Sequence, residues 1–259
     1  QFFLIAGLYC ALRACLREGP AHAGWLFAAG LAWGAAVACR LNLAPAVIFF
    51  SAVVAWRLIA RSRTTAGIPR LLLFGLPLVV WAAGLAWYNY ARFGSVLETG
   101  HRYQLTGPAL PRDYRQVSSP AYILPNLYNY LLRPLAFANH EFPPVSAPYI
   151  AESMWPRFIQ PPENYYYSEP VAGLLTTFPA VILAILPLLT LAGRFWEWLN
   201  ERRHPPPATP APPGSDLAWW LGAGGCVLTF APLLIFISST MRYLADVAPL
   251  AVVLAAMGT

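Results

Sequence analysis

Apolar and polar residues alternate along this chain in long blocks rather than at the short spacing of a soluble helix or strand. A helix needs roughly 20 apolar residues to cross a hydrocarbon layer about 30 Å thick. Seven apolar runs approach or meet that length, at residues 2–16, 22–39, 43–60, 71–90, 171–196, 217–238 and 243–257. The pattern predicts an all-α membrane protein with about seven transmembrane helices.

Most of the polar residues lie between the fourth and fifth runs. The chain therefore divides into four helices in residues 1–92, a loop in residues 93–170, and three helices in residues 171–259, with a Pro-rich linker at 197–216. Connections longer than about 15 residues are uncommon unless they are functional. We expect this loop to contain short amphipathic helices rather than irregular chain.

One such helix is predicted to begin at Ser119-Pro120 and to end before Arg133. Its apolar face consists of Ile123, Leu127, Tyr130 and Leu131. A helix of this kind is expected to lie on the outer membrane surface.

Aromatic residues border the loop and recur within it. They are Trp87, Tyr88, Tyr90, Tyr103, Trp155, Tyr165, Tyr166 and Tyr167. Such rings commonly sit at the depth of the lipid headgroups. The same residues could also line a path for a lipid carrier.

The arginines of the short connections predict the orientation in the membrane. Alternate connections contain nine of them, Arg13, Arg17, Arg57, Arg61, Arg63, Arg70, Arg194, Arg202 and Arg203, whereas the opposite set contains only Arg40 and Arg242. Positive charge in short loops stays in the cytoplasm. The turn at Arg40, the long loop and the turn at residues 238–242 are therefore expected to meet at the outer face.

Composition narrows the possible functions. The chain is 58% hydrophobic and 11% charged, with a mean hydropathy of +0.51, and its net charge of +6 comes from arginine alone because it has no lysine. The arginines are scattered at the ends of the runs, so no nucleic-acid partner is expected. The four cysteines lie in or beside apolar runs, where buried free thiols are the usual state. The sequence has no Walker loop, no dinucleotide fingerprint and no zinc-protease or hydrolase motif, which disfavours soluble nucleotide chemistry.

The turn between the second and third runs is a candidate phosphate site. Asn42 is expected to cap the following helix, with Pro45 in the first turn, where proline is tolerated. A helix N-terminus carries free N–H groups and a partial positive charge, and Arg40 beside it would complete a pocket for a phosphate. Arg40 could equally be a lipid anchor that reaches the headgroups.

A second candidate opens the last run. Arg242 and Asp246 are four residues apart and face the same way on a helix, so a structural ion pair is expected. A carboxylate inside an apolar helix is costly unless it is paired. In the functional alternative, Arg242 contacts a phosphate, Tyr243 lies beside it, and Asp246 orients the arginine.

The polar segment after the fourth run is a third candidate. Glu98 and His101 have a spacing that suits a metal ligand pair, and Glu98 and Arg102 have salt-bridge spacing. Gly100 argues against a regular helix, so a loop that uses His101, Arg102 and Tyr103 to contact a sugar is an equal alternative. A divalent metal ion is possible here but is not required by these residues.

Three segments resemble the C-type (GT-C) membrane glycosyltransferases. Residues 30–40, which end in Arg40 at an outward turn, are similar to the corresponding helix of that superfamily. The exit of the fourth run, residues 87–95 followed by Glu98 and Arg102-Tyr103, is similar to its bacterial members, of the protein mannosyltransferase and aminoarabinose transferase type. So is the segment 241–249.

The resemblance implies a multi-pass enzyme of the bacterial cytoplasmic membrane and cell envelope. It would take a sugar from a polyprenyl-phosphate donor and transfer it to an acceptor outside the cytoplasm, with membrane lipids as its other partners. Arg40, Asn42, Arg242, Tyr243 and Asp246 would then form the donor phosphate site. A transporter or flippase of lipid-linked or anionic substrates is the alternative, although no broken helix is evident in the sequence, and a non-catalytic membrane scaffold is a third possibility.

In that superfamily, an acidic residue in the first outer loop acts as the base or as a metal ligand. Here the first connection is predicted to be cytoplasmic, and the chain starts at Gln1, inside an apolar run and without a leader. We therefore expect a fragment of a longer protein that lacks the catalytic loop and cannot transfer a sugar by itself. Glu98, close to the end of the fourth run, would be the best substitute base.

Overall fold

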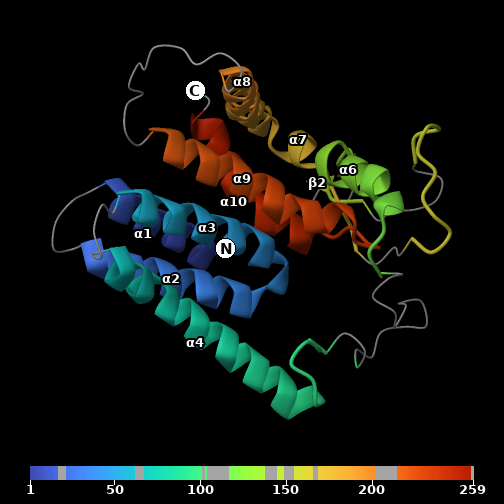
Figure 1. The fold of residues 1–259 in the computed structure, drawn as a ribbon. Helices are drawn as coiled ribbons and strands as arrows, with labels where there is room; N and C mark the ends of the chain where they lie inside the picture. The colour runs from blue at the N-terminus through green and yellow to red at the C-terminus, as the bar shows by residue number, and fades with distance from the viewer. Residues whose placement is uncertain are drawn as a thin grey trace.

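The structure is a computed structural model, and it is mostly helical (Figure 1). It describes residues 1–16, 22–61, 67–100, 103, 117–137, 145–148, 155–165, 169–201 and 215–257. In the first half of the chain, the elements are α1 (Phe2–Leu16), α2 (His22–Cys39), the 3-10 turn η1 (Leu41–Leu43), α3 (Ala44–Arg61) and α4 (Gly67–Phe93).

Shorter elements follow, and then the last helices. They are η3 (Pro120–Tyr122), α6 (Ile123–Leu131), the strands β1 (Ala136–Phe137) and β2 (Val145–Ser146), α7 (Leu174–Thr177), η5 (Pro179–Ala184), α8 (Ile185–Glu201), α9 (Ser215–Leu234) and α10 (Met241–Met257). The two strands pair antiparallel, with Ala136 opposite Ser146.

Four segments are long and apolar enough to cross a membrane. They are His22–Cys39, Leu41–Ala60, Gly67–Phe93 and Leu217–Leu234. These segments coincide with the second, third, fourth and sixth predicted runs. The chain is therefore a helical protein with at least four candidate spans in its described part, which agrees with a membrane location. The count of seven spans stays a prediction.

The fifth run is broken rather than continuous. Instead of one helix it forms α7, η5 and α8, and the break lies at Phe178-Pro179. A residue before proline is driven out of the helical region, and Phe178 has φ −141° and ψ 78°. The sequence-based expectation that no helix is broken is therefore wrong at this position.

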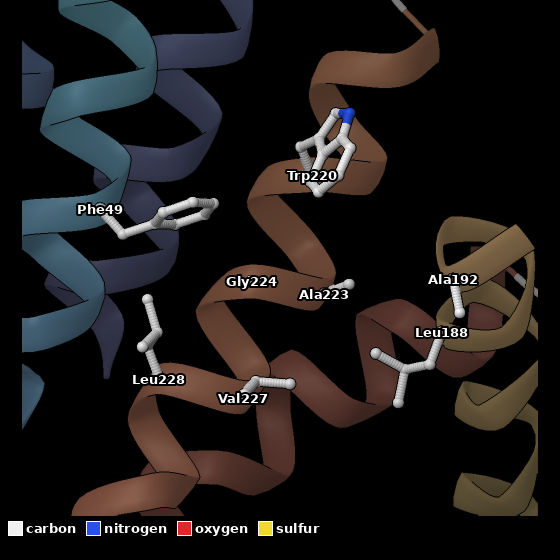
Figure 2. A pocket seen from close by; sticks show the side chains of 8 residues that line it. All are labelled: Phe49, Leu188, Ala192, Trp220, Ala223, Gly224, Val227 and Leu228. Atoms are coloured by element: carbon white, nitrogen blue, oxygen red, sulfur yellow. The ribbon is translucent and has the colours of Figure 1, made fainter. Parts of the chain in front are cut away.

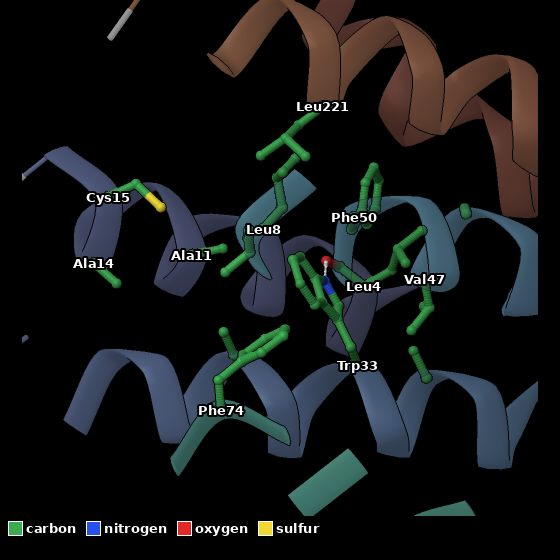
Figure 3. Packing of buried hydrophobic residues seen from close by; sticks show 14 of the residues in the cluster. Leu4, Leu8, Ala11, Ala14, Cys15, Trp33, Val47, Phe50, Phe74 and Leu221 are labelled. Carbon is green, nitrogen blue, oxygen red and sulfur yellow. Dashed lines mark hydrogen bonds between the residues drawn. The ribbon is translucent and has the colours of Figure 1, made fainter. Parts of the chain in front are cut away.

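Helix α2 lies at the centre of the N-terminal helices. It packs mainly against α1 and α4, while α3 packs against α9 and so joins the two halves of the chain (Figure 1). Trp33 of α2 is fully buried between Phe50 of α3 and Phe74 of α4, and its indole N–H donates to the Leu4 carbonyl of α1 at 3.2 Å (Figure 3). One large side chain therefore fixes four helices relative to one another.

Two glycines allow α2 and α4 to approach closely. A Cβ on Gly30 would lie 2.2 Å from the carbonyl oxygen of Phe74, and one on Gly34 would lie 2.2 Å from the Trp81 ring. Small residues four positions apart commonly form such contacts between membrane helices, because they bring the backbones together.

Helix α6 confirms the predicted loop helix and shows which of its residues pack inside the protein. Its buried residues are Pro125, Asn126, Asn129 and Tyr130, whereas Ile123 is exposed. The apolar face was expected to lie on the outer membrane surface, and Tyr130 of that face is instead buried inside the protein. The structure turns Asn126 and Asn129 inward, and Asn126 donates to carbonyls at the end of α9.

Candidate functional site

Three segments that are far apart in the sequence meet at one end of the bundle. Ser118 forms an antiparallel bridge with Phe236, and the Ser119 amide donates to the Ile235 carbonyl at 2.8 Å. The turn at Arg40 contacts the start of α10 at the same end. The predicted meeting of the turn at Arg40, the long loop and the α9–α10 connection is therefore confirmed for the described residues. Which side of the membrane this end faces stays a prediction.

Asp246 is the centre of the first contact. Its carboxylate is 3% exposed and accepts two bonds on Oδ2, one from Arg40 Nη1 at 3.1 Å and one from Asn42 Nδ2 at 3.1 Å. Asn42 lies inside η1, and its side chain is used here, so the expectation that it caps α3 is wrong. Pro45 does lie in the first turn of α3, as predicted.

Arg242 has a different partner from the one that its spacing predicts. Its Nε donates to Glu169 Oε2 at 3.1 Å, and its Nη2 contacts Glu169 Oε1. The expected Arg242–Asp246 pair is therefore wrong. Asp246 turns toward Arg40 and Asn42, which offer it two donors in a buried position, while Arg242 turns outward and is 70% exposed.

Tyr243 joins the two pairs. Its ring lies 6.0 Å from Arg40 Cζ and packs edge-on against Phe236 at 5.6 Å. Its phenol interacts electrostatically with both arginines and with both carboxylates. We call the six residues of this arrangement the charged cluster: Arg40, Asn42, Glu169, Arg242, Tyr243 and Asp246.

A buried polar network supports the cluster from the side of α6. The Asn126 amide donates to the carbonyls of Leu233, Leu234 and Phe236, at 3.0, 3.0 and 2.6 Å. The last carbonyls of a helix have no partner within the helix, so Asn126 supplies the donor that the end of α9 needs. This requirement turns the polar face of α6 inward.

The network continues to the start of α10. Asn129 donates to Ser239 Oγ at 2.8 Å and to the Tyr165 hydroxyl at 3.0 Å, and that hydroxyl donates to Asn126 Oδ1 at 2.5 Å. Asn129 also accepts a bond from Arg133 Nη1 at 2.9 Å. Tyr165 is buried inside the protein, and Tyr166 and Tyr167 lie outside the described residues. That these rings sit at headgroup depth stays a prediction.

Tyr130 and Thr240 extend the network. The Thr240 amide donates to the Tyr130 hydroxyl at 3.2 Å, and burial raises the pKa of Tyr130 well above its usual value. Tyr130 is therefore a neutral structural group. Neither Asn126 nor Asn129 was singled out for a functional role from the sequence. An asparagine pair three residues apart, Asn126 and Asn129, was the available signal.

The structure places Glu98 in the segment after α4. It is buried, and its Oε1 accepts the Gly100 amide at 2.8 Å. Gly100 has a φ of +92°, so this segment is not a regular helix, as expected. Tyr103 stacks on Phe93 at 5.3 Å. His101 and Arg102 lie outside the described residues, so their contacts with Glu98 stay predictions.

Two further sets of predicted residues can be placed. Trp87, Tyr88, Tyr90 and Tyr103 are exposed on or just beyond α4, whose C-terminal end diverges from α9 and α10 (Figure 1).

Among the described residues, no group of three or more His, Cys, Asp and Glu side chains could hold a metal ion. The four cysteines are free thiols, as predicted, but only Cys15 is buried and Cys39 is exposed.

An apolar groove of about 330 Å³ lies between α3, α8 and α9 (Figure 2). Phe49 projects from α3, Leu188 and Ala192 from α8, and Trp220 and Val227 from α9. Its lining is apolar and belongs to the hydrophobic part of the bundle. It suits a hydrocarbon chain rather than a polar ligand.

Comparison with known proteins adds no relative: no family model matches the chain, and neither a curated protein nor a solved structure matches it.

Proposed function

We propose that this chain belongs to an integral-membrane glycosyltransferase that transfers a sugar from a polyprenyl-phosphate donor to an acceptor on the extracytoplasmic side. The resemblance to the GT-C superfamily motivates the proposal. The observation that carries it is the charged cluster, in which two guanidinium groups from distant segments stand beside one tyrosine at a single end of the bundle.

The two arginines differ in how firmly they are held, and this difference suits the binding of a phosphate. Arg40 is fixed by a buried carboxylate, whereas the Arg242–Glu169 pair is exposed. Exposed ion pairs contribute only about 0–1 kcal/mol. A phosphate can therefore replace Glu169 on Arg242 at little cost, while Arg40 adds positive potential without losing its own partner.

The chemistry assigned to the site is a single displacement. A base removes the proton of the acceptor hydroxyl, whose oxygen attacks the anomeric carbon, and the bond to the polyprenyl phosphate breaks. Arg242 would stabilise the charge that builds up on the departing phosphate. Glu98 is the base that the sequence favours, and Glu169, once released from Arg242, is a second candidate for this role. The groove between α3, α8 and α9 offers room for part of the isoprenoid chain.

The alternative proposal is a transporter or flippase of lipid-linked or anionic substrates. The break between α7 and α8 favours it, because discontinuous helices often form substrate sites in transporters. The charged cluster would then bind the headgroup during its movement between leaflets.

Binding and transfer of a radiolabelled polyprenyl-phosphate sugar by the purified full-length protein that contains this chain, in lipid nanodiscs, would test these proposals. Arg242→Ala should weaken donor binding by about 10- to 100-fold, the loss of a charge-assisted hydrogen bond. Arg92→Ala is the matched control, since Arg92 is also exposed near this end but bonds Tyr88 instead. Glu169→Gln should keep the donor bound and abolish transfer.

Two results would contradict the proposed glycosyltransferase function. Unchanged donor affinity in both Arg40→Ala and Arg242→Ala would show that these residues only anchor the helices to lipid. Movement of an intact lipid-linked sugar between leaflets, without its transfer to an acceptor, would instead support the transporter.

A further inference from the structure

A second cationic cluster lies at the opposite end of α2 from Arg40. Arg13, in the last turn of α1, has its Cζ atom 5.8 Å from the ring centre of Tyr9 and 5.7 Å from that of Trp25. The two rings pack edge to face at 5.8 Å. The guanidinium is thus held by cation–π contacts with two aromatic rings, which stabilise it but accept none of its N–H bonds in the usual geometry.

His22 lies on the face of α2 that carries Trp25. It is the first residue of α2 and precedes Trp25 by three positions, so both side chains face the same side of the helix. Arg13 Nε and His22 Nε2 are both buried atoms without a hydrogen-bond partner among the described residues. A buried donor that lacks an acceptor costs about 1–3 kcal/mol. Arg13 Nε beside the two rings and His22 Nε2 on the Trp25 face of α2 therefore indicate that an acceptor completes this place.

The surroundings indicate the charge of that acceptor. Arg57, near the end of α3, and Arg70, in the first turn of α4, belong to the same end of the bundle as Arg13. None of these three arginines takes part in an ion pair within the described part of the chain. An anion is therefore favoured over a neutral or zwitterionic group.

We propose that Arg13 and His22 bind the phosphate of an anionic phospholipid, with Tyr9 and Trp25 against its glycerol region. Phosphate oxygens accept bonds from both nitrogen donors. Aromatic rings of this type sit at headgroup depth beside apolar helices, which places a lipid rather than a soluble anion within reach. The site is independent of the proposed function, because the 18 residues of α2 separate it from Arg40 by about 27 Å at 1.5 Å per residue.

Native mass spectrometry of the purified protein, titrated with phosphatidylglycerol in detergent micelles, would test the site. Arg13→Gln and His22→Phe should each lower the affinity for the first bound lipid by about 5- to 10-fold, while Arg70→Gln should change it by less than about 2-fold. Phosphatidylcholine with the same chains should bind more weakly than phosphatidylglycerol.

The controls separate the possible sources of the phosphate. Inorganic phosphate at millimolar concentration should not displace the lipid; displacement would show a soluble-anion site and overturn the proposal. Equal effects of Arg13→Gln and Arg70→Gln would also overturn it, since they would show only non-specific attraction to positive charge. If Arg13→Gln fails to fold, Arg13→Lys keeps the charge but removes Nε, and undiminished phosphatidylglycerol binding by that variant would argue against the site.

Discussion

The pairing of Asp246 can be tested by three double-mutant cycles on the free energy of unfolding. Each cycle removes the charge of one partner, then of the other, then of both. The substitutions are Arg40→Gln, Arg242→Gln, Asp246→Asn and Glu169→Gln, which keep the side-chain size close to the original. The cycles compare Arg40 with Asp246, Arg242 with Glu169, and Arg242 with Asp246.

The geometry sets the expected size of each coupling. Asp246 is 3% exposed and Arg40 is 35% exposed. A hydrogen bond to a charged group contributes about 1.5–3 kcal/mol, and the partial exposure of Arg40 favours the low end, about 1.5–2 kcal/mol. Arg242 is 70% and Glu169 is 28% exposed, so their coupling should be about 0–1 kcal/mol. Arg242 and Asp246 should couple by no more than about 0.5 kcal/mol.

The assay is reversible unfolding by SDS in mixed micelles, followed by tryptophan fluorescence and by circular dichroism. Coincident transitions from the two signals would support a two-state analysis. A coupling between Arg242 and Asp246 that exceeds the one between Arg40 and Asp246 would refute the reasoning. It would show that the local helical pair, rather than the long-range pair, exists in the folded protein.

Two further predictions concern helix packing and topology. Gly30→Ala should destabilise the fold by about 1–3 kcal/mol in the same unfolding assay, because its Cβ would lie 2.2 Å from a carbonyl of α4, whereas Gly75→Ala, with nothing within 4 Å, should be neutral or slightly stabilising. Equal effects of the two substitutions would argue against the close α2–α4 contact. In a cysteine-free background on intact cells, Ser118→Cys should react with an impermeant thiol reagent and Thr209→Cys should not, as the arginine asymmetry predicts. Labelling of Thr209→Cys alone would reverse the orientation.

The limits of sequence reasoning are clearest at Asp246. Its position inside an apolar helix correctly predicted that it needs a partner. Arg242 was predicted as that partner because residues four positions apart on a helix are neighbours, whereas contacts between distant segments cannot be read from the sequence. The actual partners, Arg40 and Asn42, lie 206 and 204 positions away. The distribution of arginines between the short connections predicted that these segments lie at the same end of the bundle. It could not predict which side chains would be in contact.

Helix α6 shows a second limit. Its start at Ser119-Pro120 and its end before Arg133 follow from local chemistry and were predictable. Its inward face was not, because the apolar periodicity predicted a face on the membrane surface and gave no sign that Asn126 and Asn129 would be buried. The inward face is determined by the carbonyls at the end of α9, which have no hydrogen-bond donor within their own helix. Asn126 can supply that donor only because the fold brings α6 and the end of α9 together.

The long-range bonds of Asp246 also have a consequence for how the protein is assembled. Membrane proteins are inserted from the N-terminus during synthesis, so in the predicted seven-span topology α2 and η1 enter the bilayer long before α10. An aspartate at the centre of an inserting helix costs about 2.5–3.5 kcal/mol, and less near a helix end. Arg40 and Asn42 are therefore already in place as a receptor for the carboxylate when α10 arrives. In the predicted seven-span topology, the turn between α2 and α3 therefore assists the insertion of α10, and its loss would leave Asp246 without its partners.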